Sequence, residues 1–209
     1  MMLDVLLEKY NNNTILRTLV NLIPSYGGSI DIFLSNRWSK IQQRRIEEQL
    51  SAFVEALSGL EGRVAELELD IATSEGLYDI LYQILDNSLK SRCPESRYGY
   101  ARVLREAIVD NNAIPDLEEV VYQIADMRER DYLVLRAVKD LFDFGVEVSG
   151  ETISTTEKVQ MTPIEAERQL FRFENMGLLD HPRNRTTRRG GMTFEKTEYF
   201  DKVISFLFK

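Results

Sequence analysis

The chain has 209 residues, of which 44% are hydrophobic and 29% charged, and its formal net charge is −8. This length suits one large or two small domains with a real core, and a single cysteine excludes an internal disulfide framework and a cysteine-rich zinc site. The N-terminus lacks the regions of a secretion signal, and no uncharged stretch approaches the roughly 20 residues of a membrane-spanning helix. We therefore expect a cytoplasmic protein.

The charge is unevenly distributed along the chain. Residues 1–128 hold 13 Lys and Arg against 20 Asp and Glu, whereas residues 129–209 hold 13 against 14. The acidic first part would repel a phosphate backbone, so any contact with nucleic acid is expected in the last third. We expect a mainly α-helical protein with two domains, a helical N-terminal domain at 1–126 and a second domain at 127–209.

The N-terminal domain is expected to contain a long helix with a heptad pattern. Short helices are predicted at 3–10 and 14–23, and from residue 30 the pattern permits one helix that runs unbroken to residue 72. Apolar residues spaced alternately four and three apart are typical of a seam that faces a partner helix. The partner helix can come from this chain or from another copy, and we expect the seam to support self-association as a coiled coil. Its residues are Ile46, Leu50, Phe53, Leu57, Leu60, Val64, Leu67 and Ile71.

Further amphipathic helices are predicted at 76–91, at 98–110 and from Asp116 onward, which would complete a helical bundle. Thr73 or Ser74 is expected to cap the first of them, because hydroxyl side chains accept from the free N–H groups of a helix start.

The pattern of residues in the last third of the sequence predicts a winged helix. A helix ending near Gly145 precedes a short β-branched and polar stretch, and Thr162 with Glu165 matches a capping box for the next helix. Two strands at 178–183 and 192–196 enclose a basic loop, and Thr197 is expected to cap a closing helix. This order of elements is typical of winged-helix domains.

Three stretches together resemble a known group of proteins. They are IPSYGGSIDIFLS with the following KIQQRRIEEQLSAFVEAL, SRYGYARVLREAI ahead of DLEEVVYQIADMRERDYLVLRAV, and FENMGLLDHP with the terminal TEYFDKVISFL. In this order they are similar to bacterial and phage-associated helical proteins that have a winged-helix-like tail and no assigned activity. The resemblance implies the architecture and transfers no site residues, while the tail's likeness to winged helices implies contact with DNA or with protein.

The residues of common catalytic sites are sparse. His181 is the only histidine, which excludes HExxH zinc sites, and we expect it to be a hydrogen-bonded structural residue. Cys93 beside Arg92 is expected to be an ordinary thiol, and Gly27 with Gly28 to serve packing or a turn. Paired carboxylates on amphipathic helices, such as Glu47 with Glu48, are expected to point into solvent. We expect no enzyme, no metal and no cofactor.

Smaller features have two interpretations each. Arg44 and Arg45 are either an ion-pairing flank or a contact for an acidic partner. Trp38 and Tyr26 are expected to pack in the core rather than to stack on nucleotides.

The best candidate for a contact surface is the basic loop at residues 183–189. Its four arginines and two threonines can lie along a phosphate backbone, although a protein-binding loop or a solvated loop explains the same composition. The preceding helix would present arginine and glutamine, which read base edges well, but also Glu165, Glu167 and Glu174, which oppose phosphates. The predicted DNA- or partner-binding residues are Arg168, Gln169, Arg172, Arg183, Arg185, Arg188, Arg189 and Lys196.

These patterns favour a non-enzymatic bacterial interaction or regulatory protein. Its helical part would self-associate or bind a partner protein, and its winged helix would contact DNA or protein. The alternative is a membrane-surface effector that uses the apolar helices around residues 14–35. We expect that alternative less, because anionic lipids favour basic amphipathic helices.

Overall fold

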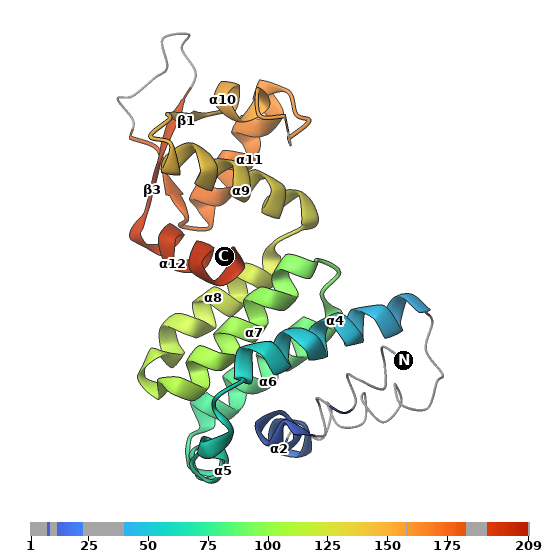
Figure 1. Cartoon of the computed structure of the whole chain (residues 1–209). Coiled ribbons are helices and arrows are strands. Elements are labelled where there is room, and N and C mark those ends of the chain that lie inside the picture. The colour runs from blue at the N-terminus through green and yellow to red at the C-terminus, as the bar shows by residue number, and fades with distance from the viewer. Residues whose placement is uncertain (1–7, 9–11, 23–39, 158, 183–191, 209) are drawn as a thin grey trace. The chain divides into compact units, whose positions relative to one another are not determined.

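The computed structural model describes residues 8, 12–22, 40–157, 159–182 and 192–208. These residues are mainly helical, with a small three-stranded antiparallel sheet near the C-terminus (Figure 1). The chain forms two compact units, Met1–Ala125 and Asp126–Lys209. The second unit thus begins one residue before the start of the predicted second domain.

Two of the described helices of the N-terminal unit pack along α7 (Figure 1). Helix α4 (Lys40–Leu57) packs along α7 (Pro94–Val109), and α6 (Glu75–Lys90) packs on the same helix. Helix α2 (Thr14–Leu22) contacts α4 and α5 (Val64–Thr73), and α8 (Ile114–Asp126) follows the short helix η2 (Asn111–Ala113). The predicted helix at 3–10 lies almost wholly outside the described residues.

Side-chain caps start two of these helices, α2 and α6. Asn13 accepts from the backbone N–H of Leu16 at 2.9 Å, and Ser74 accepts from the N–H of Leu77 at 3.2 Å. Each cap satisfies one N–H group that the first turn of a helix leaves unpaired. The predicted cap of α6 is therefore confirmed, with Ser74 rather than Thr73 in that role.

The expectation of one unbroken helix from residue 30 to 72 is wrong. Helix α4 ends at Leu57, and a turn and the short helix η1 (Glu61–Arg63) separate it from α5. Gly59 takes a φ of +83°, a left-handed conformation that glycine adopts without steric cost and that ends a helix. The heptad spacing therefore continues across a break: four of its residues lie in α4, three lie in α5, and Leu60 lies between the two helices.

Two arginines stabilise the helix ends near this break. Arg105 of α7 donates to the carbonyl oxygens of Ala56 and Ser58 at the end of α4. Arg63 donates to the carbonyl of Val109, the last residue of α7, at 3.3 Å. Because the last carbonyls of a helix have no partner within it, these arginines favour ending both helices where they do.

The C-terminal unit begins with α9 (Glu129–Asp143), which leads to β1 (Val148–Ser149), the short α10 (Gly150–Ser154) and α11 (Pro163–Asn175). Strands β2 (Leu179–Asp180) and β3 (Thr193–Lys196) follow, and α12 (Glu198–Leu207) closes the unit. The strands lie in the order β1–β3–β2 and are antiparallel, with Val148 opposite Phe194 and Asp180 opposite Glu195.

The core of this unit lies between the helices and one face of the sheet. Tyr132 and Leu135 of α9 are at most 2% exposed, as are Leu170 and Phe173 of α11. Helix α10 contacts α11 closely at Gly150, where an added Cβ would stand 2.4 Å from the carbonyl oxygen of Pro163. The side chains that complete the core are Val138, Val148, Ala166, Leu179, Phe194, Phe200, Val203, Ile204 and Leu207.

Candidate functional site

Helix α11 carries three of the predicted contact residues, and its start is held by a capping box. The Thr162 hydroxyl accepts from the N–H of Glu165 at 3.3 Å, and the Glu165 carboxylate accepts from the backbone N–H of Thr162 at 2.9 Å. The Thr162 hydroxyl also donates to that carboxylate at 3.0 Å. These hydrogen bonds, the backbone one first, hold the pKa of the Glu165 carboxyl below its ordinary value because they favour the charged form. The predicted capping box is confirmed.

The two faces of α11 differ as the periodicity predicts. Ala166, Leu170 and Phe173 are fully buried, whereas Arg168 on the opposite face is exposed. Gln169 and Arg172 lie between these faces and are partly buried. Of the three predicted contact residues on this helix, only Arg168 thus lies on its exposed face.

Gln169 and Arg172 are engaged inside the C-terminal unit. The Gln169 amide donates to Oδ1 of Asp131 at 2.5 Å, and Nε of Arg172 lies 3.5 Å from Oδ2 of the same residue. Nη2 of Arg172 donates to both the backbone oxygen and Oδ2 of Asp126 at 2.7 Å. We call Asp126, Asp131, Gln169 and Arg172 the α11 network. Its bonds engage the side-chain polar groups of Gln169 and Arg172 that would otherwise be available to a ligand.

The sequence interpretation missed Asp126 and Asp131 as parts of this region. Asp131 is only 2% exposed, and its Oδ2 also accepts from the backbone N–H of Arg128 at 2.7 Å. The bond to Arg128 could have been predicted, because an acidic residue at the third position of a helix often accepts from the backbone N–H of the residue before that helix. Its pairing with a helix more than thirty residues later has no local signal.

His181 lies just after β2 and is held by a carboxylate and two aromatic rings. Nδ1 of His181 is 2.5 Å from Oε1 of Glu174, and the ring meets Phe171 edge to face at 5.4 Å between centroids. Phe171 in turn meets Phe194 at 5.3 Å. These contacts agree with the expected hydrogen-bonded structural role of His181.

The basic loop itself lies outside the described residues, which include none of Arg183, Arg185, Arg188 and Arg189. At its far end, Oε1 of Glu167 accepts from the backbone N–H of Met192 at 3.3 Å. Lys196, the last predicted contact residue, donates to both carboxylate oxygens of Asp201 at 3.0 and 2.8 Å. Lys196 therefore has an acidic neighbour in its own unit.

The residues of the predicted seam pack within the N-terminal unit of a single chain. Phe53 and Leu57 are fully buried, and Val64 alone is partly exposed. The other five residues, between 2% and 8% exposed, are Ile46, Leu50, Leu60, Leu67 and Ile71. This burial indicates an intramolecular role for the seam.

Polar groups also lie between the helices of this unit. The Arg97 guanidinium, 3% exposed, pairs with the Glu48 carboxylate of α4, and Gln49 donates to Ser88. Glu48 also lies 3.7 Å from Arg44, as expected of an ion-pairing flank. The Glu48 side chain keeps 38% of its surface exposed, so the expectation that it points into solvent holds only in part, because α7 places a buried arginine beside it.

The remaining sequence expectations concern Cys93, the residues around Gly27 and Trp38, metal sites and membrane-spanning helices. Cys93 is buried at the start of α7. Tyr26, Gly27, Gly28 and Trp38 lie outside the described residues. Within the described ranges no group of three or more His, Cys, Asp or Glu could hold a metal ion. Among those same residues, no helix is long and apolar enough to cross a membrane.

The comparisons with known proteins identify no relative. No family model, no curated protein and no solved structure matches this chain.

Proposed function

We propose that the C-terminal unit is a winged helix. Its elements follow the order helix, strand, helix, helix, strand, strand, helix, and its strands lie in the order β1–β3–β2. In this arrangement α11 is the helix that recognises a ligand in many such domains, and residues 183–191 join the two strands of the wing.

We infer that this winged helix contacts another protein and that the chain is a non-enzymatic interaction or regulatory protein. The α11 network carries the inference, because base readout needs Arg172 and Gln169 free, and both already bond to acids of their own unit. The remaining outer positions of α11 add repulsion toward phosphates. Glu165 is exposed, and Glu167 and Glu174 are half-buried, against the single exposed cation Arg168 of this helix.

DNA is the second candidate ligand. The sequence of residues 183–189 has four arginines and no acid, which is a favourable composition for phosphate contact. A wing of this kind can hold a duplex with little help from the preceding helix, and its affinity would come from charge rather than from base readout.

The N-terminal unit would then supply a helical platform that self-associates or binds a partner protein. The membrane-surface alternative relied on outward-facing apolar residues around residues 14–35, and the structure removes part of that support. In α2 the apolar residues Ile15, Leu16 and Leu19 are fully buried against other helices, so they do not face outward. The rest of that stretch, from residue 23 to 35, lies outside the described residues.

A DNA titration separates the two ligands. Fluorescence anisotropy of a labelled duplex is measured at low and at physiological salt with the full chain and with a variant carrying Arg185→Ala, Arg188→Ala and Arg189→Ala. Binding that weakens with salt and weakens further in the variant would support DNA and contradict the leading proposal. Absence of binding even at low salt is the result that the protein-contact proposal expects.

A photo-crosslinking side chain placed at position 168 tests protein contact directly in cells. We expect a discrete protein adduct, because position 168 is on the exposed face of α11. The same crosslinker at position 122 of α8, where Tyr122 is 67% exposed, is the matched control. Equal adducts at both positions, or none at position 168, would contradict the proposal.

A further inference from the structure

Helix α5 presents an aliphatic side chain on its outer face. Leu67 and Ile71 of this helix are buried in the N-terminal unit, whereas Leu69 is 65% exposed. Ala65 and Ala72, one turn before and one turn after Leu69, are exposed and short, so they leave it open to approach from both sides. A helix that packs on one side needs only one apolar face, so Leu69 is available for contact with another molecule.

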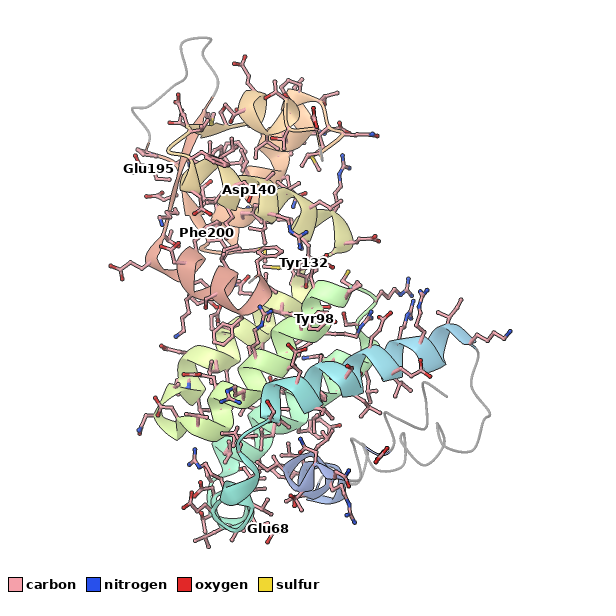
Figure 2. The ribbon with its side chains drawn as sticks, in the orientation of Figure 1. Glu68, Tyr98, Tyr132, Asp140, Glu195 and Phe200 are labelled. Atoms are coloured by element: carbon pink, nitrogen blue, oxygen red, sulfur yellow. The ribbon has the colours of Figure 1, made fainter. Side chains whose placement is uncertain are left out.

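Two carboxylates flank Leu69 on this face. Glu68 is exposed, and the Glu66 side chain is 68% exposed although Arg63 pairs with it at 3.2 Å. Figure 2 labels Glu68, which lies on α5 at the edge of the N-terminal unit in that view. We call Glu66, Glu68 and Leu69 the α5 patch. The surface that complements it has an apolar side chain between cations.

The first turn of α4 has that composition. Ile41 is 58% exposed, Lys40 beside it is exposed, and the Arg44 side chain, one turn later, is 72% exposed. Arg44 lies 3.7 Å from Glu48, but the carboxylate of Glu48 is also paired with the buried Arg97, so the surface remains positive. We call Lys40, Ile41 and Arg44 the α4 patch.

The two patches of one chain are too far apart to cover each other. Helix α4 has 18 residues, so its first turn is about 25 Å from its end, and α5 follows that end after the short η1. Figure 1 shows the start of α4 and α5 on opposite sides of the N-terminal unit. A contact between the patches therefore needs two chains.

We propose that the α5 patch of one chain docks on the α4 patch of a second copy. Leu69 and Ile41 supply the apolar contact, and the flanking glutamates face the cations. We thereby assign to these patches the self-association proposed above for the N-terminal unit, so the assignment rests on that proposed function. Because the patches differ, the contact is head to tail, and one chain can join two others.

Light scattering of the full chain over a range of concentrations tests the contact. At low salt the average mass should rise above that of one chain, and physiological salt should return it toward one chain. Leu69→Ser and Ile41→Ser should each lower the association constant at least about fivefold. Tyr122→Ser, at a 67% exposed position of α8, is the matched control and should associate like the wild type.

Exchange of charge tests the pairing of the two patches directly. The variant Lys40→Glu, Arg44→Glu and the variant Glu66→Lys, Glu68→Lys should each lose association, because like charges then face each other. An equal mixture of the two variants should associate again, because each altered patch then meets a complementary one. Adding Leu69→Ser to both variants should remove this rescue.

The control for total charge is Glu106→Lys, Glu118→Lys, which changes exposed residues of α7 and α8 and should associate like the wild type. Circular dichroism should show the same helix content in every variant, because all the changed side chains are exposed. A wild-type chain that stays monomeric at low salt, an equal loss in the control, or a mixture that does not associate would overturn the proposal. None of these outcomes bears on the contact of α11, which the adduct at position 168 tests separately.

Discussion

Arg172 shows how one side chain can leave a predicted contact surface. Its position on α11 suits an outward guanidinium, yet Asp126 accepts from it at 2.7 Å and the buried Asp131 lies 3.5 Å away. Burying a carboxylate is costly unless cations and hydrogen-bond donors compensate. The α11 network supplies that compensation, and this explains why Arg172 serves its own unit first.

We expect Arg172→Ala to destabilise the C-terminal unit by about 1–3 kcal/mol, because Asp131 would lose its cation. Urea unfolding followed by circular dichroism measures the change. Arg168→Ala on the exposed face of the same helix is the control, and it should change stability by less than about 0.5 kcal/mol. A similar loss in both variants would show that the network has no special role.

Because of Glu165, we expect the stability of the start of α11 to depend on pH. Its pKa lies below the ordinary value of 4.5 through its hydrogen bonds with Thr162, so the charged form stabilises the folded state. This contribution is present above pH 4.5 and is lost as the pH falls through the lowered pKa. Carboxyl NMR of Glu165 should therefore titrate below 4.5, and the stability difference between wild type and Glu165→Gln should shrink on acidification.

Thr162→Ala gives the matched test for this pH effect. It removes the hydroxyl that donates to Glu165, so the pKa of Glu165 should move up toward its ordinary value. An unchanged titration midpoint in this variant would mean that other groups hold the carboxylate.

At the scale of elements, the break between α4 and α5 decides what the heptad pattern means. Apolar spacing sets which face of a helix is buried, but it does not require the helix to continue. The left-handed Gly59 and the carbonyl contacts of Arg105 end α4, and α5 then turns its own apolar residues Leu67 and Ile71 inward. Two short helices replace the expected rod.

The sign of the stability change caused by Gly59→Ala distinguishes a break at residue 59 from one continuous helix. We expect it to destabilise the chain by about 1–2 kcal/mol, because alanine disfavours a positive φ. In one continuous helix the same change would stabilise by about 1 kcal/mol, since alanine forms helix better than glycine. Chemical unfolding measures it, and Gly62→Ala is the control, because an added Cβ there meets no atom within 4 Å and its φ is not positive.

At the scale of the whole molecule, the chain forms two compact units, each with buried apolar residues of its own. The apolar residues of the seam lie inside the first unit, and the sheet with its four flanking helices forms the second. Self-association therefore needs a surface other than the seam, and the mass of the chain in solution can test this.

Phe53→Ala is the variant for that test. Since Phe53 is fully buried within one chain, we expect a cavity and a loss of about 3–5 kcal/mol with no change in the mass measured by light scattering. A dimer in the wild type that becomes a monomer in the variant would show instead that the seam joins two copies.

The sequence by itself determined the helical character, the inward faces and the helix caps. Thr162, Thr197 and Ser74 act as N-caps where the local pattern places them, because capping and amphipathicity depend on residues only a few positions apart. Only the tertiary structure decided which polar residues bond within the chain and which remain available to a ligand. The bonds from Arg172 to Asp126 and from Arg97 to Glu48 join residues more than forty positions apart, and the order β1–β3–β2 brings Glu147, Glu195 and Asp180 together. Such pairings follow from how helices and strands pack across the chain, and no local spacing encodes them.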